Sequence, residues 1–326
     1  MSETASARSL IALVRPFARE NIARSWFHVV STLTLMAALF VLTLVGPIWF
    51  RVPIALLAGL TVIRGFILYH DHLHGALLKN SWVMKALMAV FSVLVMTPRR
   101  HWQDAHNRHH ANNSKIAGAN TDSYMVLTTH EWAAMSSWQR LMYRLSRHPI
   151  TFFLAFFTVF MFGQMLSSIV TNPTRYWDSI IVFFLHVGLT VGFITCLGWT
   201  TYALTIFLPL ASSMMIGSYL FFAQHNFPDI YIQQPASWQF TRAALDSSSY
   251  LETGPFWRWV TGNIGYHHVH HLHPLIPFYR LPEAMNAVPE LQNPHRTTLH
   301  PRDIIACFRM NLWDPDQERM VRYPRA

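Results

Sequence analysis

Residues 54–74, with the sequence IALLAGLTVIRGFILYHDHLH, join an apolar run directly to a cluster of histidines. The run at 54–69 is interrupted only by Arg64, which lies close enough to its end for the side chain to reach the membrane interface. On a helix that continues beyond the run, His70 and His74 share a face, whereas His72 points to nearly the opposite side. This stretch predicts a transmembrane helix that ends in potential metal ligands.

The composition also indicates a membrane protein. Of the 326 residues, 52% are hydrophobic and 13% are charged, and this charged share is about half the usual quarter. Aromatic residues make up 14%, as suits a chain that faces lipid and crosses two interfaces. Disordered, collagen-like and coiled-coil chains are excluded. The two cysteines, Cys196 and Cys307, offer no disulfide framework and indicate a reducing compartment.

Several apolar runs are candidate membrane spans, for which about 20 residues are needed. Residues 29–50 form the first run, and a short turn at 50–53 connects it to the run at 54–69. Residues 86–97 are too few to cross the bilayer. The remaining candidates are residues 150–170, 180–198 and 201–222.

The histidines restrict the topology, because clusters that share one site must lie on one side of the membrane. The number of crossings between the cluster at 106–110 and His225 must then be even. The loop 171–178 carries Arg175 and the link 198–200 carries no charge, which favours residues 180–198 and 201–222 as the hairpin. Residues 150–170 would lie in the interface or re-enter, with six crossings as the alternative. We expect an all-α membrane protein with about four transmembrane helices and a cytoplasmic helical cap that carries a di-metal site.

The same topology explains the net charge of +9. Of the 25 Lys and Arg residues, only Arg51 would lie outside and only Arg64 in the membrane. The charge therefore reflects orientation, and with no DNA or RNA motif we expect no nucleic-acid partner.

We expect a single domain over residues 1–326. Residues 1–28 form a basic amphipathic segment on an anionic leaflet and are not a removed signal peptide. Residues 29–273 form the membrane and histidine core, and the Pro-rich residues 274–326 form an irregular cytoplasmic cap.

Histidines are unusually frequent, with 19 His against 16 Asp and Glu. The segments 106–110 (HNRHH) and 267–271 (HHVHH) share an HxxHH spacing, which places three imidazoles on one helical face. Imidazole nitrogens bind Fe, Zn, Cu or Ni at about 2.0 to 2.2 Å. The clusters together exceed what one ion can bind, so we predict two metals.

Other metal proteins fit less well. The chain has no HExxH motif of a zinc protease and no ExxH carboxylate motif of a soluble di-iron bundle. A membrane haem protein would need histidines on facing helices, and His186 alone lies deep in a span. We expect His186 to pack or to make a polar contact between helices.

Three histidine motifs follow one another along the chain: HxxxH, then HxxHH about thirty residues later, then a distant HxxHH. This order resembles that of the integral-membrane fatty acid desaturase family. The motif residues are 70–75 (HDHLHG), 106–112 (HNRHHAN), 262–272 (GNIGYHHVHHL) and 276–281 (IPFYRL). The resemblance covers about residues 54–282 and is closest to bacterial acyl-lipid Δ12 or omega-6 desaturases.

The resemblance implies a non-haem di-iron centre. Its implied ligands are His70, His74, His106, His109, His110, His225, His267, His270 and His271. Asn263 could hold a metal-bound water or orient a ligand, and it could equally be a turn residue. His72, His268 and His273 are surplus, and each could replace a ligand or support one. Asp71 and Asp104 are candidate acceptors for ligand N–H groups.

The resemblance also implies O2-dependent insertion of a cis double bond into an acyl chain. The expected substrate is an acyl lipid or another fatty acyl group, in a multi-pass membrane protein (the inner membrane, if bacterial) with a cytoplasmic active site. No redox-cofactor motif is present, so an external donor of the ferredoxin or cytochrome b5 type is expected. The rival interpretations are a hydroxylase, acetylenase or carotenoid ketolase with the same centre, and a non-enzymatic metal-binding membrane protein or transporter.

Overall fold

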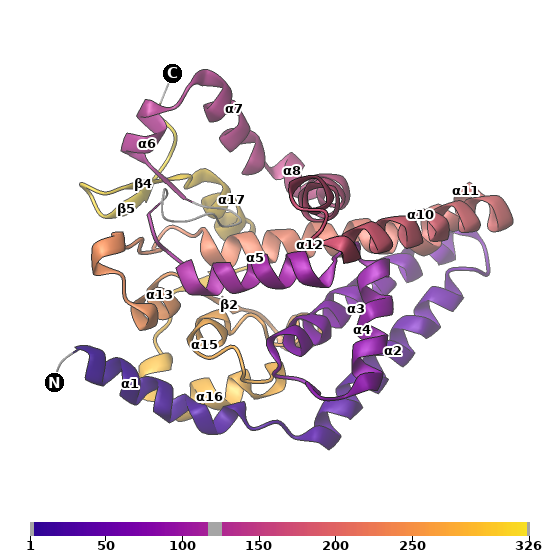
Figure 1. The fold of residues 1–326 in the computed structure, drawn as a ribbon, viewed down its shortest axis with the longest axis horizontal. Helices are drawn as coiled ribbons and strands as arrows, with labels where there is room; N and C mark the ends of the chain where they lie inside the picture. Colours follow the sequence, from indigo (N-terminus) through magenta and orange to yellow (C-terminus); the bar gives the residue numbers. More distant parts are fainter. Residues whose placement is uncertain (1–2, 117–125, 325–326) are drawn as a thin grey trace. The chain divides into compact units, whose positions relative to one another are not determined.

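The computed structural model describes residues 3–116 and 126–324 (Figure 1). The chain divides into two compact units, which we describe separately. The first unit comprises Met1–Arg19, Ala105–Thr151 and Tyr219–Ala326, and the second comprises Glu20–Asp104 and Phe152–Ser218. Two helices, α5 (Arg99–Asn112) and α12 (Leu208–His225), contribute residues to both units.

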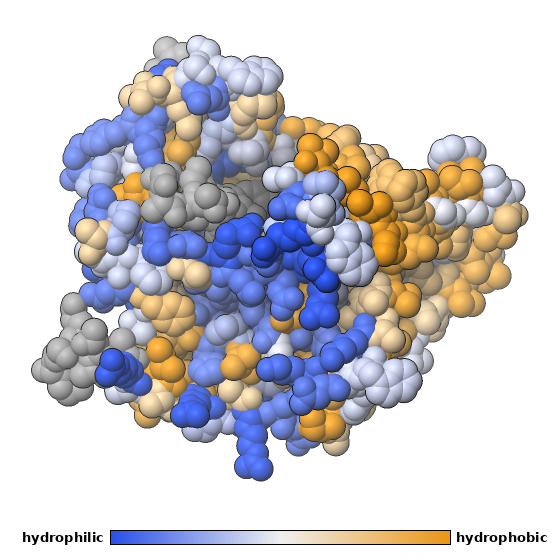
Figure 2. All heavy atoms as spheres, viewed as in Figure 1, coloured by the Kyte–Doolittle hydropathy of each residue, from blue (hydrophilic) through white to orange (hydrophobic). Residues whose placement is uncertain are grey.

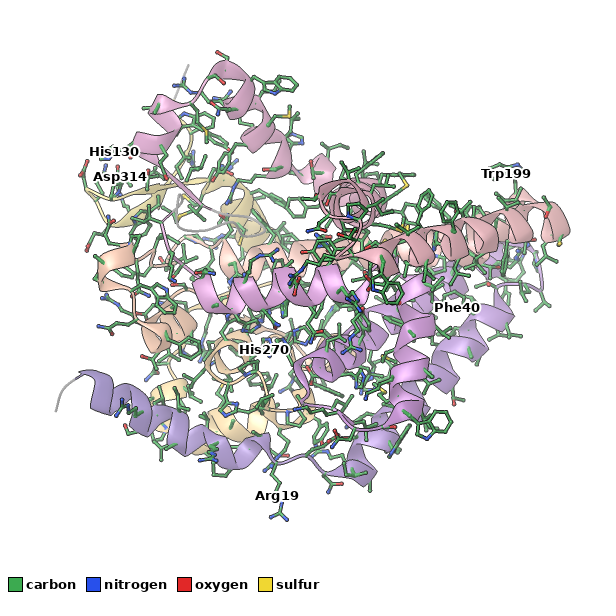
Figure 3. All side chains as sticks on the ribbon, in the orientation of Figure 1. Arg19, Phe40, His130, Trp199, His270 and Asp314 are labelled. Atoms are coloured by element: carbon green, nitrogen blue, oxygen red, sulfur yellow. The ribbon has the colours of Figure 1, made fainter. Side chains whose placement is uncertain are left out.

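The second unit contains most of the membrane-spanning sequence. Its elements are α2 (Ile22–Leu42), α3 (Ile48–His74), α4 (Trp82–Leu94), the π-helical η2 (Phe156–Leu166), α9 (Ser167–Thr171), α10 (Trp177–Leu197), α11 (Trp199–Tyr202) and the π-helical η3 (Ala203–Phe207). Trp199 lies at the turn between α10 and α11 (Figure 3), and much of the surface of α10 is apolar (Figure 2).

Among the described residues, four helical segments are long and apolar enough to cross a membrane. They are Ile22–Leu42, Ile48–His74, Trp177–Leu197 and Trp199–His225. Four candidate spans are therefore present in the predicted order, and the bent pair Trp82–Leu94 and Arg99–Asn112 would add a fifth if it counts as one span. The apolar helix Phe156–Thr171 is shorter than the about 20 residues that a span requires, in agreement with an interfacial or re-entrant position for residues 150–170.

The first turn lies earlier than predicted. Helix α2 ends at Leu42 and α3 begins at Ile48, whereas the turn was expected at residues 50–53. Gly46 takes a left-handed φ of 89° and Pro47 precedes the first helical residue, so these two residues end the turn at 43–47. Arg51, expected in that turn, lies in α3, is buried, and donates from Nε to the Thr43 carbonyl at 2.5 Å.

The side chain of Arg64, expected to reach the interface, is paired within the helical hairpin. Its side chain is buried, with Nε donating to Thr32 Oγ1 at 3.0 Å and Nη2 3.2 Å from His28 Nδ1. These polar groups of α2 satisfy the guanidinium within the hairpin, which removes the need to reach water. His186 was predicted correctly, because its Nδ1 contacts the Val93 carbonyl at 3.0 Å and joins α10 to α4.

The first unit is also mainly helical. Its helices are α1 (Glu3–Val14), η1 (Arg15–Ala18), α6 (Thr129–Ala134), α7 (Ser137–Ser146), α13 (Phe240–Asp246), α14 (Pro255–Val260), α15 (His267–Leu272), α16 (Leu281–Ala287) and α17 (Pro301–Arg309), with 3-10 turns η4 (Pro235–Ser237), η5 (Phe278–Arg280) and η6 (Pro289–Leu291). The short α8 (Pro149–Phe153) leads from this unit into the second.

Two small sheets in the described part of the first unit were not predicted. Strand β1 (Leu127–Thr128) pairs in parallel with β4 (Leu312–Asp314), which pairs antiparallel with β5 (Arg319–Val321). Strand β2 (Tyr250–Glu252) pairs in parallel with β3 (Arg296–Thr298). Residues 274–326 were expected to be irregular, but their described part forms helices and strands. Strands β3 and β4 pair with the earlier strands β2 and β1, and Phe308 of α17 stacks on Phe222.

Candidate metal centre

Two helices of the first unit carry the HxxHH motifs. Helix α15 has six residues, and each of them is buried. It follows a tight turn in which Gly262 and Asn263 have positive φ angles of 52° and 56°. In the second motif, on α5, His106, His109 and His110 are buried, whereas Asn107 and Arg108 between them are exposed. Both helices therefore direct their imidazoles inward.

The first group of imidazoles, the four-histidine cluster, comprises His109, His225, His267 and His271. Its Nε2 atoms lie close together: His225 is 2.9 Å from His109, 2.7 Å from His267 and 3.1 Å from His271. His271 is also 3.2 Å from both His109 and His267. Two ligands at right angles on one ion, each about 2.1 Å away, would be separated by about 3.0 Å. The spacing fits a single bound metal ion.

Hydrogen bonding within the four-histidine cluster does not account for this spacing. The Nδ1 atom of His225 faces the Ser247 carbonyl at 3.3 Å, and a carbonyl only accepts, so this nitrogen carries the proton. In neutral His225 the Nε2 atom then carries a lone pair and no proton. Three imidazole nitrogens surround this atom, and only one of them can donate a hydrogen bond to its lone pair. A cation can bind all four lone pairs at once, so the donor set fits a metal.

The second group, the three-histidine cluster, comprises His106, His110 and His270, the last of which is labelled in Figure 3. The Nε2 atom of His110 lies 3.2 Å from that of His106 and 3.1 Å from that of His270. The set is buried and contains nitrogen donors only. It could contribute part of the coordination sphere of a second ion, with further ligands from elsewhere.

The two HxxHH helices divide their ligands in a reciprocal way. Helix α5 contributes His106 and His110 to the three-histidine cluster and His109 to the four-histidine cluster. Helix α15 contributes His267 and His271 to the four-histidine cluster and His270 to the other. Each helix therefore supplies its i and i+4 pair to one cluster and its i+3 residue to the other. On neither helix do the three histidines belong to a single cluster.

Burial favours the neutral form of His271 in the four-histidine cluster. Desolvation, together with the neighbouring imidazoles of His110, His267, His225 and His109, lowers the pKa of His271 well below its usual value. A neutral imidazole presents the lone pair that a metal requires, so the site is ready to bind an ion near neutral pH.

The first histidine motif lies at the end of α3, in the second unit. The rings of His70 and His74 are 4.6 Å apart, and Gly75, with a left-handed φ of 80°, ends the helix immediately after them. Asp71 Oδ1 lies 2.9 Å from His70 Nδ1, the contact expected of an acceptor that orients a ligand. Asp104 was expected in the same role, but its Oδ2 instead pairs with Arg175 at 2.6 Å.

The surplus histidines face backbone groups or lie outside the clusters. His72 Nδ1 contacts the Leu77 carbonyl at 3.0 Å, and His268 Nε2 contacts the Leu291 carbonyl at 3.1 Å. Burial lowers the pKa of His268 to about 4. Neither these two residues nor His273 belongs to a cluster of the described residues.

Asn263 occupies a turn. Its Nδ2 donates to the Phe278 carbonyl at 3.3 Å, and its carbonyl accepts from Tyr266 N at 3.0 Å, directly before α15. Its catalytic role stays a prediction.

Sequence reasoning missed two neighbours of the clusters. The Ser247 carbonyl orients His225, and a backbone group has no sequence signature. The Phe221 ring, one helical turn before His225, lies 5.0 Å from the His109 ring and 6.5 Å from the His106 ring. Its i to i+4 spacing from His225 was the available signal.

Comparisons with known proteins agree with this geometry. The family model described as "Fatty acid desaturase" matches residues 47–303. The chain is 31% identical over 271 residues to a "Fatty acid desaturase" of Bacillus subtilis, covering 80% of this chain and 74% of that protein. It is 23% identical to an "sn-1 acyl-lipid omega-3 desaturase (ferredoxin)" of Nostoc (82% and 76% covered) and 24% identical to an "sn-1 oleoyl-lipid 12-desaturase" of Synechocystis (84% and 78% covered).

Proposed function

Because this chain belongs to the fatty acid desaturase family, we propose that it inserts a cis double bond into the acyl chain of a membrane lipid, using O2 and two irons. It is a membrane fatty acid desaturase, an O2-dependent oxidoreductase with four helices that can span the bilayer. The observation that carries the proposed metal chemistry is the convergence of buried imidazole nitrogens on two points of the first unit.

We assign the metal ligands by cluster. The four-histidine cluster would hold one iron, and the three-histidine cluster would provide part of the shell of the other. When bound, two irons supply the activation of O2 and the oxidation of an unactivated methylene. The protein contributes neutral nitrogen donors in a buried site.

His70 and His74 are proposed to complete the shell of the second iron. The support comes from helix continuity: the Trp102 ring lies 5.6 Å from the His70 ring, and Trp102 and His106 are four residues apart on α5. Residues at this spacing share a helical face. Asp71 would fix the orientation of His70 by accepting from Nδ1, which leaves Nε2 for the metal.

Asn263 is proposed to orient a ligand, which was one of its two predicted roles. Its positive φ and its bond to the Phe278 carbonyl hold the turn from which α15 starts, three residues before Tyr266 and four before His267. An Asn263→Ala variant should bind iron more weakly, because the turn is then less well fixed.

The substrate and the electron donor are proposed from the relatives. The Nostoc and Synechocystis proteins are named as acting on acyl lipids, and the former is named with ferredoxin. We propose an acyl-lipid substrate, a ferredoxin-type donor and a site on the cytoplasmic side of the membrane. The cytoplasmic position is supported by the preponderance of basic residues outside the spans.

The metal assignment is tested by measuring iron and zinc in the purified chain. We expect two irons per chain, a loss of iron in His109→Ala, and no loss in His130→Ala, whose side chain is exposed and contacts Asp316. One zinc per chain would contradict the assignment, as would iron retained at two per chain in His109→Ala.

The reaction is tested by lipid analysis of a host that expresses the chain. New cis double bonds should appear with the wild type and not with His109→Ala. Hydroxylated acyl chains in their place would identify the same centre with a different outcome.

A further inference from the structure

Helix α7 (Ser137–Ser146) carries an apolar stripe on its outer surface. Trp138, Leu141, Met142 and Leu145 are 66%, 45%, 38% and 43% exposed. At about 100° per residue, these four side chains fall within an arc of about 100°. None of the ten residues of this fully described helix is buried. Such a surface is unusual for a helix in contact with water alone.

The opposite side of α7 packs against other residues of the first unit. The guanidinium groups of Arg140 and Arg144 lie 5.5 and 5.2 Å from the centre of the Trp132 ring, and Arg140 Nε donates to the Trp132 carbonyl at 3.0 Å. Arg144 also lies 5.1 Å from the centre of the Tyr323 ring. The helix is thus held by its basic side, and the apolar stripe points away from Trp132.

The charge of this region indicates which partner covers the stripe. Between Glu131 and Asp178 the sequence contains no acidic residue, whereas α7 and the turn after it contain Arg140, Arg144 and His148, which are at least partly exposed. The chain then enters the apolar run at 150–170, whose first residue, Ile150, is 46% exposed. A basic helix with an apolar stripe, continuous with membrane sequence, matches an anionic lipid surface.

We propose that α7 lies in the plane of an anionic membrane surface, with Trp138, Leu141, Met142 and Leu145 inserted at the boundary between head groups and acyl chains. The helix is too short to span, at ten residues. Its Ser136 and Gln139 form a capping box that begins the helix independently of the membrane. The proposal does not depend on the enzymatic reaction.

The test is a spin-label scan of the full chain in nanodiscs that contain phosphatidylglycerol. Cysteines are placed one at a time at positions 137–146 in a Cys196→Ser, Cys307→Ala background, and collisions of the nitroxide with O2 and with a water-soluble nickel complex are compared. We expect the ratio of O2 to nickel collisions to follow a 3.6-residue period. The ratio should be several-fold higher at Leu141 and Leu145 than at Gln139, an exposed position on another face of the same helix.

Three results would overturn the proposal. High nickel collision rates at Leu141 and Leu145 would place the stripe in water. Low collision rates with both reagents, accompanied by dipolar broadening, would identify a second copy of the chain as the partner. Equal depths in phosphatidylglycerol and phosphatidylcholine nanodiscs would remove the role of the anionic head groups.

Discussion

Asn226, the residue after His225, joins three segments of the first unit. Its Oδ1 accepts from Arg147 Nη1 at 2.6 Å, and its Nδ2 donates to the carbonyls of Cys307 and Met310 at 2.7 and 2.8 Å. Asn226 is fully buried and Arg147 is nearly so. We predict that Asn226→Leu, which keeps the approximate volume but removes all three hydrogen bonds, lowers the stability of this unit substantially.

The magnitude follows from the types of bond that are lost. Each neutral hydrogen bond contributes about 0.5 to 1.5 kcal/mol, and a bond to a charged group contributes about 1.5 to 3 kcal/mol. The expected loss in the free energy of unfolding is about 2.5 to 6 kcal/mol. At about 2 °C per kcal/mol for a large chain, the Tm should fall by at least about 5 °C.

The assay is thermal unfolding of the purified chain in detergent, followed by intrinsic fluorescence at a fixed heating rate. Asn311→Leu is the matched control, because the side chain of this buried residue donates a neutral hydrogen bond to the Phe308 carbonyl at 3.1 Å. Its expected loss is about 1 kcal/mol. In a double-mutant cycle with Arg147→Met, the coupling to Asn226 should be about 1.5 to 3 kcal/mol. Equal Tm shifts in the two Asn variants, or no coupling, would refute the reasoning.

Three further substitutions give distinct readouts. In Gly265→Ala, the new Cβ would lie 2.7 Å from the Leu251 carbonyl oxygen, so β2 must shift. We expect the free energy of unfolding to fall by about 1 to 3 kcal/mol and the metal to be retained more weakly. The Tm and the iron content measure these two effects. Burial raises the pKa of the Cys307 thiol to about 12, so the unfolded chain releases this proton first as the pH rises above about 9. Stability should then fall with pH more steeply in the wild type than in Cys307→Ala, as measured by denaturant titration, and Cys307 should resist alkylation until the chain unfolds. His186→Leu removes the contact with Val93 O in the membrane and should cost about 0.6 to 2 kcal/mol without loss of iron.

The sequence predicted the helical class and the spans because long apolar runs have few alternatives in a membrane. It placed the first turn wrongly, since Gly46 and Pro47 compete with Pro53 for the turn, and Pro53 is tolerated within α3. It could not identify Thr32 and His28 as partners of Arg64, because they come from another helix and become visible only once α2 and α3 are packed.

The candidate ligands could be chosen from spacing, but their surroundings could not. Asp71 was a correct choice of partner for His70 because adjacent residues can meet without knowledge of the fold. Asp104 was a wrong choice because Arg175, 71 residues away, binds it instead. The small sheets were missed for the same reason, since β1 and β4 are two and three residues long and pair across most of the chain.

The HxxHH spacing explains how two short helices can serve two metals. On an α-helix the residues i and i+4 lie about 40° apart around the axis, whereas i+3 lies about 80° from the midpoint of that pair. The pair and the single residue therefore point toward two separate places. Where α5 and α15 contribute to the same clusters, the pair of one helix meets the single residue of the other, as His106 and His110 meet His270. A motif with all three histidines on one narrow stripe would crowd a single ion. The broader HxxHH arc instead fits two separate groups of nitrogen ligands, as the two irons proposed above would require.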